Sequence, residues 1–123
     1  MKIKNILIID DDRELSSIVK DLLHYYGYDA MVVHEPKKGI EVAKKRQPDL
    51  ILLDVLMPSM NGREVCKVLK RQEETKNIPV IFLTAKDSAD DIAGEIEAGG
   101  SGHFSKPFDS KKLLEKIKEL LHQ

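Results

Sequence analysis

The sequence contains little that would place it outside the cell or in a membrane. Its one cysteine, Cys66, excludes an internal disulfide framework and is compatible with a reducing cytoplasm. The apolar run at residues 6–9 is too short for the core of a signal peptide, and no later run is long enough to span a bilayer. The formal net charge of −1 argues against bulk affinity for nucleic acid or an anionic membrane. We therefore expect a cytoplasmic protein that contacts neither a membrane nor nucleic acid directly.

The composition is that of a globular protein. Of the 123 residues, 41% are hydrophobic and 33% are charged. A chain of this length buries roughly two-thirds of its unfolded surface. The sequence has no internal repeat, low-complexity tract or linker rich in glycine and serine. It therefore predicts a single domain over residues 1–123.

Two periodicities alternate along the chain. Continuous apolar runs at residues 6–9, 50–53 and 80–83 predict strands covered on both faces, and residues 29–34 and 102–105 are weaker strand candidates. Between them, apolar residues recur at steps of three and four near residues 15–26, 40–43, 65–72, 92–96 and 113–121, as in helices with one buried face. The first stripe includes Ile18 and Tyr26, and the fourth is formed by Ile92, Ala93 and Ile96. The pattern predicts an α/β fold, a doubly wound (βα)5 unit with a parallel sheet.

Polar side chains follow the strands at the points where they end. Asp10 and Asp11 come after the first strand, Asp54 after the third, Thr84 at the end of the fourth and Lys106 after the fifth. In an open parallel sheet the ligand crevice lies at the carboxyl ends of the strands. We therefore expect these side chains to converge on one site, provided that the first and third strands are neighbours.

Three carboxylates in one crevice disfavour one another's ionisation, so a cation is needed to neutralise them near neutral pH. An all-oxygen site of this kind suits Mg²⁺, which binds one or two carboxylates together with a phosphate. Lys106 and Thr84 would supply a positive charge and a hydroxyl donor to that phosphate. The residues therefore predict a site for magnesium and a phosphoryl group, and Asp54 is tolerated in its apolar run because it faces that site.

Other polar residues have simpler explanations. Asp12 is expected to cap the first helix, and Asp109 or Ser110 to cap the last. Cys66 lies beside the apolar stripe of its helix and is expected to pack in the core. The "GGSG" at residues 99–102 lacks the strand and helix that flank a dinucleotide-binding loop.

The sequence closely resembles the receiver domain of bacterial two-component response regulators. The resemblance covers essentially the whole chain. It rests on four motifs in order, namely "ILIIDDD" (6–12), "PDLILLDVLMPSMNG" (48–62), "IPVIFLTAKD" (78–87) and "AGGSGHFSKPF" (98–108). It implies a flavodoxin-like five-stranded sheet in the order 2-1-3-4-5.

The resemblance also implies that Asp54 is a phosphoacceptor. It would take a phosphoryl group from a phosphohistidine on a sensor histidine kinase or phosphotransfer protein, in a phosphorelay. By family analogy, Asp11, the Asp54 carboxylate and the backbone carbonyl of Leu56 hold Mg²⁺, with Asp10 acting largely through water. The domain would assist its own phosphorylation and dephosphorylation as a switch, and would not be an enzyme in the usual sense.

The remaining site residues follow from the same resemblance. Lys106 would bind one phosphoryl oxygen, and Thr84 another with help from the backbone amide of Ala85. The Lys106–Pro107 peptide is expected to be cis, which aims the lysine into the site. Gly62 is expected to give the turn after the Asp54 loop its conformational freedom.

The resemblance further implies a conformational switch. On phosphorylation Thr84 moves toward the phosphate and an aromatic residue three positions before the lysine turns inward. Here that position is His103, which is smaller, polar and titratable near neutral pH. The output surface is expected at residues 88–121, for a downstream effector or for self-association.

Two rival interpretations remain open from sequence. The "IIDDD" segment also fits the start of haloacid-dehalogenase-type phosphatases, with Asp10 as nucleophile and Asp12 as acid/base. The chain lacks that family's later acidic pair and its cap insertion. The second rival is a degenerate receiver that only binds partners, although every expected site residue is present.

Overall fold

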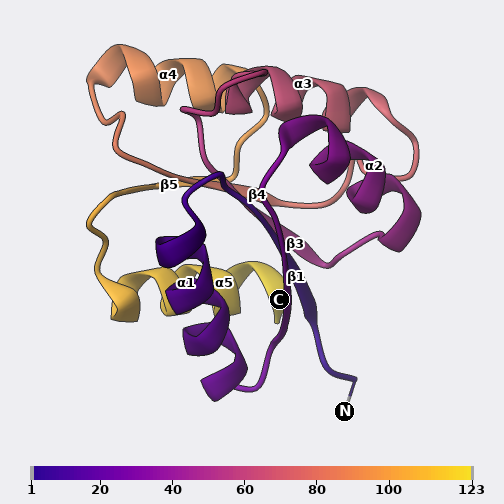
Figure 1. Cartoon of the computed structure of the whole chain (residues 1–123), viewed down its shortest axis with the longest axis vertical. Helices are drawn as coiled ribbons and strands as arrows, with labels where there is room; N and C mark the ends of the chain where they lie inside the picture. The colour runs from indigo at the N-terminus through magenta and orange to yellow at the C-terminus, as the bar shows by residue number, and fades with distance from the viewer. Residues whose placement is uncertain (1, 123) are drawn as a thin grey trace.

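The computed structural model describes residues 2–122, in which strands and helices alternate (Figure 1). The strands are β1 (Asn5–Ile9), β2 (Asp29–Val33), β3 (Leu50–Leu53), β4 (Val80–Thr84) and β5 (Gly102–Ser105). The helices are α1 (Arg13–Tyr25), α2 (Pro36–Arg46), α3 (Gly62–Arg71), α4 (Ala89–Glu97) and α5 (Ser110–Leu121). All ten elements lie in the order that the two periodicities predict.

The strands form one parallel sheet in the order β2-β1-β3-β4-β5, which confirms the predicted fold class. β1 and β3 are neighbours, and Ile9 lies opposite Leu53 in their register. Asp10 and Asp54 directly follow these two residues. The pairing of β1 with β3 therefore brings two of the predicted site carboxylates to the same edge of the sheet.

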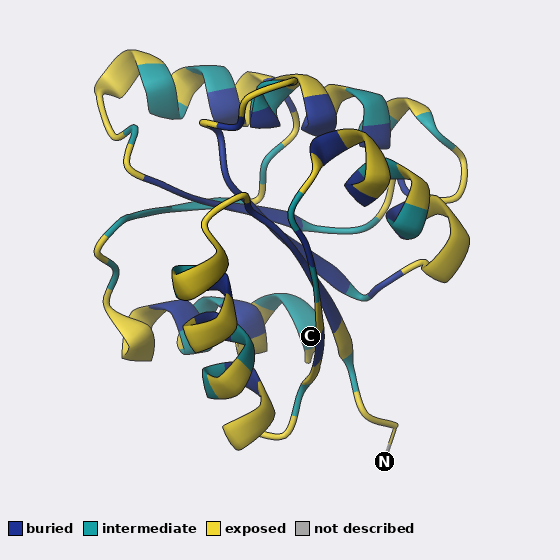
Figure 2. Ribbon diagram, in the orientation of Figure 1, coloured by how far each residue is buried: buried dark blue, intermediate teal, exposed yellow. Residues whose placement is uncertain are grey.

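A hydrophobic core lies on each face of the sheet because successive strand residues point to opposite faces. In β1, Ile6 and Ile8 pack with α1 and α5, whereas Leu7 and Ile9 pack with α2 and α3. Figure 1 shows α1 and α5 together below the sheet and the other three helices above it. β1, β3 and β4 run as a largely buried layer between the two groups of helices, whereas β5 is half-buried (Figure 2). This scaffold fixes the strand ends from which the site is built.

The helix caps match the local sequence. The Asp12 carboxylate accepts a hydrogen bond from the Leu15 amide at the start of α1, as predicted. Asp109, rather than Ser110, caps α5 and accepts from the Lys112 amide. Such caps satisfy amide groups that have no partner within the helix.

The apolar stripes of α1 and α4 were predicted only in part. Ile18 and Tyr26 are each 56% exposed, so they lie outside the core that the rest of α1 contacts. In α4 the prediction was wrong, because Ile96 is 66% exposed whereas Glu95 is only 2% exposed. The helix therefore turns Glu95 inward, where its carboxylate contacts His103 of β5.

Gly62 is the first residue of α3, and its role differs from the prediction. Its backbone needs no left-handed conformation, since Gly62 is not among the glycines of positive φ. A Cβ at this position would instead clash with the backbone carbonyl oxygen of Asp54. Gly62 is therefore required because α3 starts against the loop that carries Asp54.

Cys66 is fully buried within the core above the sheet, as predicted. Burial raises the pKa of its thiol to about 11, so the group is protonated near neutral pH. Within residues 2–122, no helix has both the length and the apolar character needed to cross a membrane.

Candidate functional site

The carboxylates of Asp10, Asp11 and Asp54 form a cluster at the carboxyl ends of β1 and β3. One oxygen from each lies within 4.8 Å of the others. Asp10 and Asp54 are 3% and 5% exposed, whereas Asp11 is exposed to solvent. The sequence-predicted convergence of these three side chains is therefore present in the structure.

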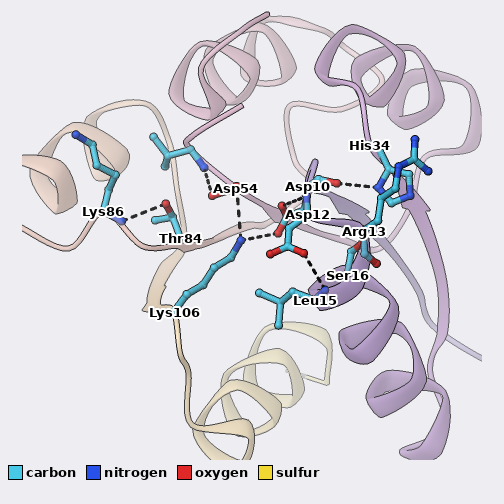
Figure 3. A network of polar contacts seen from close by, with 11 residues as sticks. Asp10, Asp12, Arg13, Leu15, Ser16, His34, Asp54, Thr84, Lys86 and Lys106 are labelled. Atoms are coloured by element: carbon cyan, nitrogen blue, oxygen red, sulfur yellow. Dashed lines mark hydrogen bonds and ion pairs between the residues drawn. The ribbon is translucent and has the colours of Figure 1, made fainter. Parts of the chain in front are cut away.

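Lys106 reaches this cluster from the loop that follows β5. Its Nζ lies 2.7 Å from Asp10 Oδ2 and 3.6 Å from Asp54 Oδ2 (Figure 3). The Lys106–Pro107 peptide is cis, as predicted. Ninety-six residues separate Lys106 from Asp10 in the sequence, and the sheet order brings them into contact.

The buried carboxylates change the acid–base properties of the site. Burial, followed by the negative charge of Asp10, raises the pKa of Asp54 to about 6. The Lys106 charge and hydrogen bonds from Thr84 and the Val55 amide oppose this rise. Burial alone would lower the pKa of Lys106, but its contacts with Asp10 and Asp54 raise it overall. Lys106 is therefore charged at neutral pH. Ionisation of the Asp54 carboxyl at that pH costs free energy in the folded protein, because its pKa is raised.

The donor set fits a hard divalent cation. All three side chains offer oxygen ligands, and one ammonium group balances only one of three carboxylate charges. Two of the carboxylates are buried, while Asp11 keeps the cluster open to solvent. Mg²⁺ prefers such a site because it binds through one or two carboxylates and keeps several of its waters. The cluster can therefore hold a metal ion.

Thr84, Ala85 and Leu56 lie around the same edge. Thr84 ends β4 and is fully buried, and its Oγ1 accepts a hydrogen bond of 3.3 Å from the Lys86 amide. Ala85 is the next residue and is exposed. Leu56 lies two residues after Asp54 in the β3–α3 loop, with 52% of its surface exposed. Their predicted roles at a phosphoryl group and a metal remain predictions.

Asp12 lies beside the cluster but is engaged elsewhere. Its carboxylate caps α1, and its backbone amide donates to Asp10 Oδ1 at 2.9 Å (Figure 3). An acid/base role for Asp12, as in a phosphatase that uses Asp10 as nucleophile, is not supported by this arrangement. Asp10 itself is held by Lys106 and by the Asp12 amide.

One histidine at this edge was not predicted from the sequence. His34 follows β2, and its Nδ1 lies 3.0 Å from the backbone carbonyl oxygen of Asp10. Its position directly after a strand that pairs with β1 was the available signal. The sequence offered no further reason to select His34, because the histidines show no metal-ligand spacing.

The second missed residue is Glu95. His103 lies in β5, and its Nδ1 is 2.5 Å from Glu95 Oε1. Its Nε2 lies 3.2 Å from Ser105 Oγ. The predicted switch residue is therefore bound to a buried glutamate of α4, which explains why that helix turns Glu95 inward.

Comparisons with known proteins agree with this geometry. The sequence profile of the response regulator receiver domain matches residues 6–118. The DNA-binding dual master transcriptional regulator RpaA of Synechocystis is 39% identical over 118 residues, which is 96% of this chain and 49% of that protein. The transcriptional regulatory protein CpxR of Escherichia coli K12 is 37% identical over the same shares of the two chains.

Solved structures agree as well. The chemotaxis protein CheY4 of Vibrio cholerae superposes with a TM-score of 0.91 at 28% identity, covering 98% of this chain and 100% of that one. This chain belongs to the response regulator receiver domain family. It spans about half the length of the curated relatives that it matches.

Proposed function

We propose that this domain is a phosphoacceptor switch whose acceptor is Asp54. The donor would be a phosphohistidine on a sensor histidine kinase or a phosphotransfer protein. The observation that carries this proposal is the buried Asp54 carboxylate, which lies in one cluster with Asp10 and Asp11 and 3.6 Å from the Lys106 ammonium. A carboxylate nucleophile that belongs to a metal-binding cluster and has a fixed cation beside it is suited to phosphoryl transfer.

In the proposed reaction an Asp54 carboxylate oxygen attacks the phosphorus atom. The bond between phosphorus and the donor's imidazole nitrogen breaks, and an acyl phosphate forms on Asp54. The Lys106 ammonium, 3.6 Å from Asp54 Oδ2, is placed to bind a phosphoryl oxygen as charge shifts onto the transferred group. Catalysis here is positioning and charge neutralisation, which a loose phosphoryl-transfer transition state requires.

Mg²⁺ is the proposed cofactor, held by Asp11, Asp54 and the carbonyl of Leu56, with Asp10 acting largely through water. When bound, it would neutralise the carboxylates and the phosphoryl oxygens. The match between three clustered carboxylates and a single lysine supports this assignment.

Phosphorylation would then change the surface around β5. Thr84 would move toward the phosphoryl group, with the Ala85 amide as a second donor, and His103 would respond from the neighbouring strand. We place the output surface at residues 88–121, for a downstream effector or a second copy of the domain. We propose a cytoplasmic location, with no direct contact to membrane or nucleic acid.

Longer relatives include DNA-binding regulators, and this chain matches about half of their length. We propose that residues 1–123 form one receiver domain, and that any DNA binding in the pathway resides outside it. The alternative is a degenerate receiver, which would bind partners without being phosphorylated. Beryllofluoride binding distinguishes the two.

Beryllofluoride, which mimics an aspartyl phosphate, provides that test. With Mg²⁺ present, it should bind the wild type and fail to bind Asp54→Asn, because an amide oxygen is a poor ligand for beryllium. Asp10→Asn should bind more weakly and still bind. Equal binding by the wild type and Asp54→Asn, or none by the wild type, would refute the assignment of Asp54.

A further inference from the structure

The contact between α4 and β5 is built around a buried carboxylate. Glu95 is 2% exposed, and its Oε1 lies 2.5 Å from His103 Nδ1. Its other oxygen, Oε2, is buried and has no hydrogen-bond partner among residues 2–122. Since a buried carboxylate without partners is costly, His103 is a principal stabiliser of Glu95 in this position.

The contact continues toward the candidate site. His103 Nε2 is 3.2 Å from Ser105 Oγ, so the ring is held at both nitrogens. Ser105 pairs with Thr84 in the register of β4 and β5, and the Lys106 amide donates to the Thr84 carbonyl at 2.9 Å. Glu95, His103 and Ser105 therefore form a polar chain that ends beside two residues of the proposed phosphoryl site.

Charged groups on neighbouring elements act on the same carboxylate. Burial raises the pKa of Glu95, and the His103 contact and the charge of Arg63 on α3 oppose that rise. Asp91, one turn earlier on α4, adds to it. The buried Glu95 carboxylate is therefore stabilised by its contact with His103, which is the residue at the predicted switch position.

We propose that Glu95 is a positioning residue that holds His103 in the resting conformation and so opposes activation of the domain. Turning the His103 ring away from α4 would break both ring contacts and leave the Glu95 carboxylate buried and without a partner. The resting state is stabilised by this contact and the activated state lacks it. This inference rests on the proposed function, in which His103 changes conformation when Asp54 is phosphorylated.

The test is the affinity for beryllofluoride in the presence of Mg²⁺ at one fixed pH. Glu95→Met keeps a side chain of similar size and removes the contact, so it should bind beryllofluoride about tenfold more tightly, as expected for loss of one charge-assisted hydrogen bond in the resting state only. Glu95→Gln keeps shape and one acceptor and should show a smaller gain. Glu97→Met makes the same change at an exposed position of α4 and should bind as the wild type does.

A double-mutant cycle links the gain to His103. In a His103→Ala background, Glu95→Met should alter the affinity by less than twofold, because the contact is already absent. Urea unfolding shows whether each variant is folded, and Glu95→Gln serves where Glu95→Met is not. Affinity of both Glu95 variants within twofold of the wild type, or an equal gain in the two backgrounds, would overturn the proposal. Asp54-dependent binding in the wild type separates that result from a failure of the proposed function.

Discussion

Two regions of the molecule differ in how deeply they are buried. The inner half, which consists of strands β1 and β3 with helix α3, is buried far more completely than the outer half, which consists of strand β5 with helix α4. From Ile6 to Ile9, and throughout β3, the strand residues are at most 2% exposed. Every residue of β5 is only half-buried, and α4 exposes Ile96 while it buries Glu95.

This difference separates two tasks. The inner half holds Asp10 and Asp54 on strands that are packed on both faces, which fixes the distance between the carboxylates. The outer half is joined to the rest by fewer buried apolar side chains and by a polar pair of buried Glu95 and half-buried His103. Segments with few buried apolar contacts open and shift at lower free energy. The scaffold thus places the proposed acceptor site on a firmly packed part of the fold, beside a segment that we expect to move at lower free energy.

The largest expected effect contrasts two apolar truncations. Leu53→Ala removes a fully buried side chain from β3 and should lower the free energy of unfolding by about 2–5 kcal/mol. Ile96→Ala removes a side chain that is 66% exposed and should change it by about 0.5 kcal/mol or less. Urea unfolding of both variants measures the contrast. Similar losses in the two variants would mean that the outer half is packed as firmly as the inner half.

A glycine substitution in each half should also differ in outcome. Gly62→Ala places a methyl group against the Asp54 carbonyl and should destabilise the fold by about 1–3 kcal/mol, with weaker beryllofluoride binding. Gly94→Ala on α4 meets only the Arg63 side chain, which can move aside, and alanine favours a helix. Its stability should be unchanged or slightly higher. A stable Gly62→Ala with normal binding would show that the α3 start is not held against Asp54.

The buried Asp54 should make stability depend on pH. Its folded pKa of about 6 exceeds the ordinary value of 3.8, so its contribution to stability is full below pH 3.8 and is lost as pH rises through 6. Asp54→Asn avoids this loss, and in EDTA it should be more stable than the wild type at pH 7.5, by at most about 3 kcal/mol. The gain should disappear near pH 4.

The control for this prediction is added Mg²⁺. Because Mg²⁺ is proposed to bind the ionised carboxylates, it should stabilise the wild type more than Asp54→Asn and reverse their order. A stability gain of equal size at pH 4 and pH 7.5 would contradict the account, since it would not reflect ionisation of Asp54.

The smallest expected effects distinguish the roles of two adjacent carboxylates, Asp11 and Asp12. Asp12→Ala removes the α1 cap and should cost about 1 kcal/mol of unfolding free energy, with little change in Mg²⁺ affinity. Asp11→Ala should weaken Mg²⁺ binding and leave stability nearly unchanged, because this side chain is exposed. Metal titration and urea unfolding of both variants test the division. The two variants would have equal Mg²⁺ affinities if Asp11 and Asp12 contributed alike.

Most of the inner half could be predicted from the sequence. Continuous apolar runs identify strands buried on both faces, and a charged residue directly after such a run marks the strand end, as Asp10 and Asp54 do. The strand order came from the resemblance to receiver domains, since periodicity does not say which strands are neighbours. The three-carboxylate cluster follows once that order is known.

The outer half could not be predicted in the same way. Helical periodicity places Ile96 inside because it treats each apolar residue as a core residue. Whether Glu95 can be buried instead depends on His103, which lies eight residues later on another element. The role of Gly62 is also tertiary, because it depends on how closely α3 approaches the Asp54 carbonyl and not on the local backbone.

Chemical identification of the phosphorylated residue is the most direct test of the proposal that Asp54 is the phosphoacceptor. The protein is incubated with acetyl phosphate, with and without Mg²⁺, and the acyl phosphate is reduced with borohydride and located by tandem mass spectrometry. We predict one modified residue, Asp54, with labelling that requires Mg²⁺ and is absent in Asp54→Asn. Modification of Asp10 in its place, or labelling of Asp54→Asn at the wild-type level, would contradict it.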